Sequence, residues 1–387
     1  MTQDSAYKRS LGLFELVSLG VGGTIGSGIF VVPGIAARLT GASSLYAWLI
    51  VAVSASCVLI SLATVSTRFT RSGSFYTLFD SVFGKTPAVL LILLYLVSSI
   101  FGVSTIAAGI GQYITYFGIT QVLFVEIGII AVFCCINIIG ISFSGKTENI
   151  LTTLKIIPLV LISLLLLPFI RPENFVPSAP LTAAGLFATI IIVYWPFTGF
   201  EISAIPVEET KDPRLIQKSL LYVMVIVASV YLLLNIALIG SIGAPALAAS
   251  PAPVAAAAGL VFTNAGPLVA FIGIIAMLSA LNAYIIGTSR VMQSLSARFS
   301  VNWIQNLGKN GTPVYALIAG CTLSAALLFA SNHFYQLASI SVITTLIPYI
   351  FFCIAAWILI PDTTVRLVSA AGAASTFSIL AMYFIIL

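Results

Sequence analysis

Apolar runs of about 18 or more residues recur from residue 11 to the end of the chain. A helix needs about 20 apolar residues to cross a bilayer, whereas a β-barrel strand alternates polar and apolar residues over about ten. Only 27 of the 387 residues are charged (16 Lys and Arg, 11 Asp and Glu), far below the quarter or so of soluble domains. The sequence therefore predicts an all-α polytopic membrane protein, residues 1–387 forming a single transmembrane domain with the lipid bilayer as its partner. It excludes a cytosolic enzyme, a disordered chain and a nucleic-acid-binding protein.

Eleven segments are expected to cross the membrane: 11–36, 43–67, 86–117, 122–142, 149–169, 183–208, 215–242, 266–297, 313–331, 335–360 and 364–387. If the N-terminus is inside, thirteen of the 16 Lys and Arg residues fall on the inner side. Arg38 and Arg171 fall outside, and Lys155 lies within a span. This positive-inside bias predicts a cytoplasmic N-terminus, and we expect an integral protein of the plasma (inner) membrane.

Metal and cofactor chemistry is not expected. The five cysteines lie inside apolar segments without CxxC spacing, and the chain has a single histidine, His333. An odd number of buried thiols in this pattern indicates neither a disulfide framework nor a metal site.

The first span is interrupted by five glycines in nine residues, between Gly20 and Gly28. Each glycine destabilises a helix interior by up to about 1 kcal/mol relative to alanine, so we expect the helix to break at mid-membrane. The alternative is a small-residue packing face, because Gly22 and Gly26 fit a GxxxG pattern.

The sixth span carries the run YWPFTGFE at 194–201 in its middle. Pro196 removes a helical hydrogen bond and Gly199 weakens the next turn, which predicts a second break. A proline kink packed against neighbouring helices is the alternative. Freed backbone groups at this depth are tolerated only where they line a cavity or are buried in protein.

The two interruptions occupy the first position of each half if ten helices form two five-helix repeats. Such a pair is typical of inverted-repeat transporters with a site at mid-membrane. Unwinding at Gly26–Gly28 would expose helix N-terminal amides suited to a carboxylate, and carbonyls at Pro196–Thr198 would accept from an ammonium group. The pattern favours an α-amino acid as the substrate.

These residues resemble the amino acid–polyamine–organocation (APC) transporters. The run GVGGTIGSGIFVVPG at 20–34 is similar to their first-helix motif, and YWPFTGFEISAIPVEETKDPR at 194–214 to their sixth helix and the following acidic loop. The resemblance implies a LeuT-like 5+5 inverted repeat with helices 1 and 6 broken, alternating access, and substrate contacts from both breaks. The first repeat would be about 11–170, the second about 183–360, and 364–387 an extra helix.

Three groups of residues are predicted to bind the substrate, the first two implied by the resemblance and the third by the polar residues of the eighth span. The first break contributes Ile25, Gly26, Ser27, Gly28 and Ile29, the second break contributes Trp195, Phe197, Thr198 and Gly199, and the eighth span contributes Asn282 and Tyr284. For Trp195, Asn282 and Tyr284, packing in the protein interior is the alternative. Members commonly have twelve helices and this chain about eleven, so a dimer interface from the last two helices is in doubt, and a monomer or a homodimer is expected.

Two charged residues are predicted to lie deep in the membrane. Lys155 in the fifth span either snorkels to the interface or takes part in coupling, with Ser279 as a hydrogen-bond neighbour. In some family members a similar lysine occupies the place of a sodium ion. Glu201 is a proton-sensitive gate, a partner for a cationic substrate, or a structural cap of the broken sixth helix. Glu126 is expected at a membrane face.

We therefore predict a secondary active transporter of amino acids, by proton-coupled symport or by exchange, with protons as the candidate coupling ion. A polyamine or other organic-cation transporter of the same fold is the alternative, although it would be expected to carry more intramembrane acid than Glu201. A membrane enzyme lacks a recognisable catalytic set here, and a channel lacks a charged ring or a filter repeat.

Overall fold

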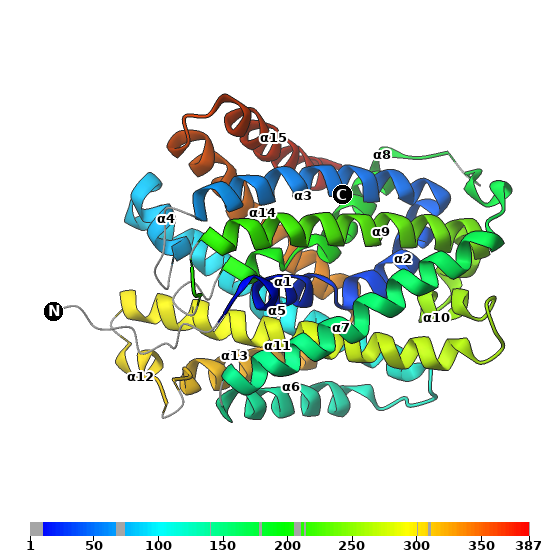
Figure 1. Ribbon diagram of the computed structural model, residues 1–387, viewed down its shortest axis with the longest axis horizontal. Coiled ribbons are helices and arrows are strands. Elements are labelled where there is room, and N and C mark those ends of the chain that lie inside the picture. The colour runs from blue at the N-terminus through cyan, green and yellow to red at the C-terminus, as the bar shows by residue number, and fades with distance from the viewer. Residues whose placement is uncertain are drawn as a thin grey trace.

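The computed structural model describes residues 11–66, 74–139, 141–177, 180–204, 210–212, 214–299, 301–308 and 311–386. The longest helices run along the long axis of the molecule, with α1 and α5 near the centre of the bundle (Figure 1). The helices are α1 (Leu13–Thr24), α2 (Ser27–Thr40), α3 (Ser44–Ser66), α4 (Ser74–Phe83), α5 (Lys85–Thr115), α6 (Val122–Ile139), α7 (Ile141–Leu166), α8 (Ala183–Tyr194), α9 (Arg214–Ala249), α10 (Pro253–Ala258), α11 (Ala265–Arg298), α12 (Asn302–Gln305), α13 (Val314–Ala330), α14 (Phe334–Leu359) and α15 (Thr363–Ile386). Within these residues the only β-type pairing is an isolated bridge between Leu11 and Thr210.

Each of the eleven predicted spans is found in the structure, the first of them divided into α1 and α2. Nine described segments are long and apolar enough to cross a membrane. The first of them, Leu13–Ser66, contains two predicted spans, and the shorter apolar helix Val314–Ala330 supplies another, which gives eleven. The expected long helices are α5 with 31 residues and α11 with 34. The sixth span differs most, because its regular helix ends at Tyr194 and short 3-10 turns follow over the described residues up to Ala204.

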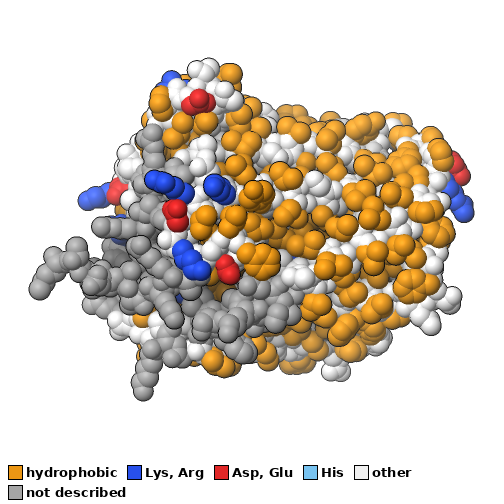
Figure 2. All heavy atoms as spheres, viewed as in Figure 1, with side chains coloured by type: hydrophobic (Ala, Val, Ile, Leu, Met, Phe, Trp, Pro, Cys, Tyr) orange, Lys and Arg blue, Asp and Glu red, His pale blue; other side chains and the backbone are white. Residues whose placement is uncertain are grey.

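The surface matches a protein surrounded by lipid. Apolar side chains cover the middle of the molecule, while charged side chains gather toward the two ends of its long axis (Figure 2). Many large hydrophobic residues are exposed on the surface, for example Phe124, Leu367 and Phe384, each more than 60% exposed. In water such a surface would be unfavourable, and in a bilayer it faces hydrocarbon. The protein is therefore an integral membrane protein.

Small polar residues join helices that are distant in sequence. Ser98 on α5 bonds the backbone and hydroxyl of Ser341 and the hydroxyl of Thr345 on α14. The C-terminal helix α15 docks on α3 through Ser61–Ser369 and Ser54–Ser375 bonds, each 2.9 Å long. In an apolar surrounding, where neither partner can bond water, such pairs fix which helices are neighbours.

Candidate functional site

The first break separates α1 from α2 at Ile25 and Gly26. The Ile25 amide makes the last bond of α1, to the Val21 carbonyl at 2.8 Å, and α2 begins at Ser27. A side chain at Gly26 would overlap Ala280 on α11, so only glycine allows this close approach. No side chain caps the N-terminus of α2. Its first amides therefore form a donor site at the positive end of a helix.

The second break begins where α8 ends at Tyr194. The chain continues through the 3-10 turns η4 (Trp195–Phe197) and η5 (Phe200–Ala204). Thr198 is extended and Gly199 has φ +94°, a left-handed conformation that favours glycine. A Cβ at Gly199 would lie 2.7 Å from the Gly23 carbonyl oxygen, so the two breaks are in backbone contact.

Tyr231 on α9 connects the two breaks. Its hydroxyl lies 2.8 Å from the Thr24 carbonyl and 3.0 Å from the Pro196 carbonyl. A tyrosine hydroxyl has one proton to donate, so these two carbonyls share it. Tyr231 was not among the predicted residues, because nothing in the sequence distinguishes it within its apolar span.

Lys155 is completely buried on α7. Its ammonium donates to the Gly22 carbonyl at 2.8 Å and to Ser279 Oγ at 2.9 Å, which joins the end of α1 to α11. The alternative that Lys155 snorkels to the interface is therefore wrong for this structure. A cation at this depth is favourable only when oxygen acceptors replace water.

Glu201 lies beside the second break and is also buried. Its carboxylate accepts from Tyr349 at 2.7 Å, from Tyr95 at 3.0 Å and from the Gly199 amide at 3.1 Å. These donors come from α14, from α5 and from the broken segment itself. The carboxylate therefore caps the break and also ties it to two long helices.

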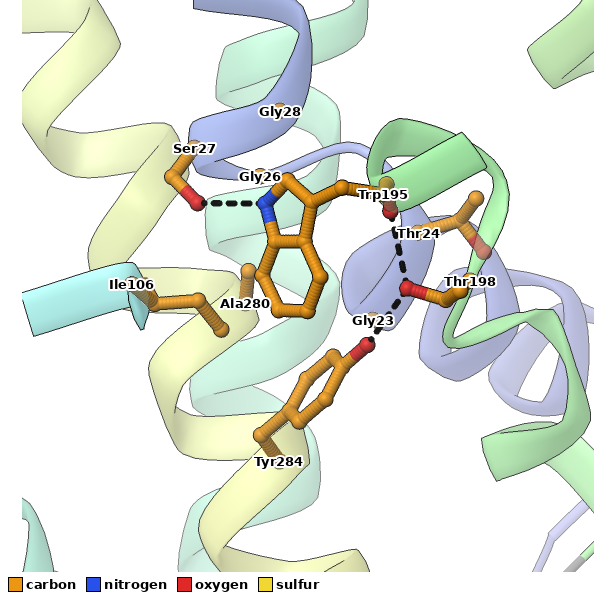
Figure 3. Close-up of a pocket in the computed structure, with 10 residues that line it drawn as sticks. All are labelled: Gly23, Thr24, Gly26, Ser27, Gly28, Ile106, Trp195, Thr198, Ala280 and Tyr284. Carbon is orange, nitrogen blue, oxygen red and sulfur yellow. Dashed lines mark hydrogen bonds between the residues drawn. The ribbon is translucent and has the colours of Figure 1, made fainter. Parts of the chain in front are cut away.

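A small cavity lies between the breaks (Figure 3). The centre of a water molecule can move through about 10 Å³ of it, so the site is nearly closed. Its lining residues are Gly23, Thr24, Gly26, Ser27, Gly28, Ile106, Trp195, Thr198, Ala280 and Tyr284. The Trp195 indole fills the space beside α2 and donates to Ser27 Oγ at 3.3 Å. Thr198 bonds the Trp195 carbonyl at 2.8 Å and the Tyr284 hydroxyl at 3.1 Å.

Six of the eleven predicted binding residues line this cavity: Gly26, Ser27, Gly28, Trp195, Thr198 and Tyr284. The other five, Ile25, Ile29, Phe197, Gly199 and Asn282, do not line it. Phe197 packs edge-on against Tyr231 with ring centroids 5.1 Å apart. The Asn282 side chain accepts from Asn137 Nδ2 on α6 at 2.9 Å, so it serves helix packing. The sequence had not indicated Gly23, Thr24, Ile106 or Ala280.

Glu126 lies in the second turn of α6, near the end of that helix as expected, but it is not interfacial. Its side chain is 1% exposed, inside the helix bundle. Among the described residues, no three His, Cys, Asp or Glu side chains come together as a metal site would require. The arrangement therefore offers hydrogen-bonding and electrostatic groups: the first amides of α2, and the carbonyls of Thr24 and Pro196, which share the hydroxyl of Tyr231.

A family model described as "Amino acid permease" matches residues 11–387. Among similar proteins, the branched-chain amino acid permease BcaP of Bacillus subtilis is 24% identical over 320 residues, covering 76% of this chain and 68% of that protein. The serine/threonine exchanger SteT of the same organism is 26% identical over 377 residues, covering 92% and 85%. The inner membrane transport protein YbaT of Escherichia coli is 26% identical over 359 residues, covering 90% and 83%. These relatives are transporters and not enzymes.

The fold is shared with a solved transporter. The crystal structure of MhsT in complex with L-phenylalanine matches with a TM-score of 0.76 at 14% identity, covering 98% of this chain and 99% of that one. The chain therefore has the LeuT-like fold, with its first and sixth helices broken as the sequence predicted.

Proposed function

The chain belongs to the amino acid permease family of the APC superfamily, and from this premise we propose that it carries amino acids by alternating access, through proton-coupled symport or exchange. The repeats would span about 11–170 and 183–360, with 364–387 as an extra helix. The N-terminus would be on the cytoplasmic side of the plasma (inner) membrane, as the distribution of basic residues favours.

One observation carries the proposal: the first amides of α2 lie close to Pro196, and the carbonyls of Pro196 and Thr24 share one hydroxyl proton. The substrate carboxylate would bind the amides at the start of α2, next to Ser27. The ammonium would donate to the carbonyls of Thr24 and Pro196, for which Tyr231 provides a single proton. An α-amino acid has both charged groups on one carbon, so one molecule would bind both sets of backbone groups.

Trp195 would act as the cover of this site. Its indole now donates to Ser27 Oγ, in the place that the substrate carboxylate would take. Substrate binding would exchange this bond for a charge-assisted one, which is roughly twice as strong. The indole would first leave Ser27 so that the substrate can enter, and it would then cover the bound substrate.

The lining also favours a neutral amino acid over a polyamine. No charged side chain is among the ten lining residues. Glu201, the acidic residue predicted to lie deep in the membrane, already accepts hydrogen bonds from three donors. A second cationic group of a polyamine would have no partner at this wall, which would be unfavourable by several kcal/mol.

The test is counterflow of labelled amino acids in proteoliposomes containing the purified protein. We expect uptake of at least one neutral amino acid, competition by related amino acids and none by putrescine. Gly26→Ala should abolish uptake, because its side chain would overlap Ala280, while Gly128→Ala should not, since Gly128 faces open space. Absence of counterflow with every amino acid would refute the proposal, and strong competition by putrescine would favour the polyamine alternative. A pH gradient across the vesicle would then separate symport from exchange.

A further inference from the structure

One side of α6 faces the helix bundle. Its buried residues are Glu126, Ile130, Phe133, Cys134 and Asn137, at the spacing of a single helical face. Near the C-terminal end of α6, the Asn137 amide has hydrogen-bond partners, because it donates to the Phe133 carbonyl at 2.8 Å and to Asn282 at 2.9 Å. Near the N-terminal end, the Glu126 carboxyl has an oxygen without such a partner among the described residues.

The Glu126 carboxyl is held tightly against the backbone of α5. A Cβ at Gly111 would overlap Glu126 Oε1, so this close contact depends on glycine. The other oxygen, Oε2, is buried and has no hydrogen-bond partner among the described residues. An oxygen with neither water nor a donor is the least favourable surrounding for a negative charge.

No cation compensates for it among the described side chains. The helix α6 packs against α5, α7, α11 and α13. Lys155 on α7 is occupied by the Gly22 carbonyl and Ser279, and Tyr113 on α5 by the Phe30 carbonyl. The remaining described titratable groups on these helices and on α6 are Lys85, Tyr95, Tyr284, Arg290, Arg298, Tyr315, Cys134, Cys135 and Cys321, and none of them forms an ion pair with Glu126. The position fits a neutral carboxyl and not a carboxylate.

We propose that Glu126 is a proton-binding site, protonated in this closed conformation and able to release its proton when α6 and α5 separate enough to admit water. Glu126 is the fifth residue of α6, close to the exposed loop 116–121, at the end of the molecule away from the basic loops. The proton would be exchanged with that side, which is the outer side in the proposed orientation. A link between this proton and transport rests on the proposed function, whereas the protonation itself does not.

The direction of the effect follows from linkage. The closed conformation binds one more proton than a conformation in which water reaches Glu126. Acid therefore favours the closed conformation, by up to about tenfold per pH unit, and alkali favours the open one. Glu126→Gln, which is neutral at every pH, should remove this dependence.

The first experiment is infrared spectroscopy of the purified protein at neutral pH. The C=O stretching band of protonated carboxyl groups should lose intensity in Glu126→Gln relative to wild type. It should be unchanged in the control Glu173→Gln, which removes an exposed carboxylate at the same end of the molecule. A band of the same intensity in wild type and Glu126→Gln would mean that Glu126 is ionised, and would overturn the proposal.

A second variant covers the case in which Glu126→Gln does not fold. Methionine has nearly the same length and no charge, so Glu126→Met should fold with a thermal midpoint equal to or above that of wild type. Its advantage should grow as pH rises, because only the wild type must retain on folding a proton that the unfolded chain releases. A difference that is constant with pH would refute the site. Neither measurement requires a substrate, so a failure of the proposed transport function would be recognised separately.

Discussion

The two broken helices differ in the side chains that stabilise them. At the first break, donors cap freed carbonyls: Lys155 binds the Gly22 carbonyl and Tyr231 the Thr24 carbonyl. At the second break Tyr231 also binds the Pro196 carbonyl, and in addition an acceptor caps a freed amide, because Glu201 binds the Gly199 amide. Lys155 and Tyr231 come from α7 and α9, whereas the other partners of Glu201, Tyr95 and Tyr349, come from α5 and α14.

This difference explains how one cavity can present both kinds of backbone group. Capping the carbonyls of the first break leaves the amides at the start of α2 available. Capping an amide of the second break leaves carbonyls there, of which Pro196 shares its donor with Thr24. The first amides of α2 thus remain available at the first break, and the carbonyls of Thr24 and Pro196 have one hydroxyl proton between them. Substitutions at each break should have effects that distinguish these two roles.

The largest effect is expected for Lys155→Ala at the first break. Both Gly22 O and Ser279 Oγ would lose a charged donor in a dry interior, and hydrogen bonds to charged groups contribute about 1.5–3 kcal/mol. Net transport in proteoliposomes should therefore fall about 10- to 100-fold, with any pH-driven accumulation lost more than substrate binding. Lys218→Ala, an exposed lysine on α9, is the matched control. Unchanged pH-driven accumulation in Lys155→Ala would remove this lysine from the mechanism.

The next effect is expected for Gly199→Ala at the second break. Its left-handed backbone disfavours a side chain by about 1–2 kcal/mol, and the new Cβ would also lie 2.7 Å from Gly23 O, a backbone atom that cannot rotate away. The thermal midpoint should fall, and transport should fall about 5- to 30-fold. Gly84→Ala separates the two contributions, because Gly84 has φ +83° with nothing within 4 Å of its Cβ position. Equal losses in the two variants would show that contact between the breaks is unimportant.

The sequence predicted both breaks because their causes are local. Five glycines in nine residues, and a Pro followed three residues later by Gly, weaken a helix wherever it is placed. The eleven spans were predictable for the same reason, since length and apolarity are local properties.

The groups that satisfy the breaks were less predictable. Tyr231 is one aromatic residue in an apolar helix. Its role depends on how close its hydroxyl lies to two carbonyls, those of Thr24 and Pro196, which belong to other parts of the chain. Asn282 and Tyr284 are two residues apart, on different faces of α11, and only packing decides that Tyr284 lines the cavity while Asn282 turns toward α6. The burial of Glu126 was not predicted, because closeness to the end of a helix does not reveal which face of that helix is covered by its neighbours.

Tyr231→Phe is expected to have a smaller effect than either substitution above, because it removes one neutral hydroxyl from between the breaks. The carbonyls of Thr24 and Pro196 would lose their shared proton, which would be unfavourable by about 1–3 kcal/mol when no substrate is bound. A bound ammonium would restore a donor, so apparent affinity should be kept or increased while the maximal exchange rate falls about fivefold or more. Tyr222→Phe on the exposed face of α9 is the control. Reduced affinity with an unchanged maximal rate would contradict the proposed place of the ammonium.

The smallest effect concerns a group outside both breaks. Ser375 on α15 bonds Ser54 at 2.9 Å, and Ser54 bonds the hydroxyl of Tyr194, the last residue of α8, at 3.1 Å. Ser375→Ala removes one neutral hydrogen bond, with a net contribution of about 0.5–1.5 kcal/mol, so transport should fall only about two- to fivefold. Ser369→Ala removes a similar bond to Ser61 that does not reach the break, and it should lower the thermal midpoint equally without slowing transport. If both variants transport equally well, α15 supports the fold alone, and the position of the second break depends on Glu201 and its partners.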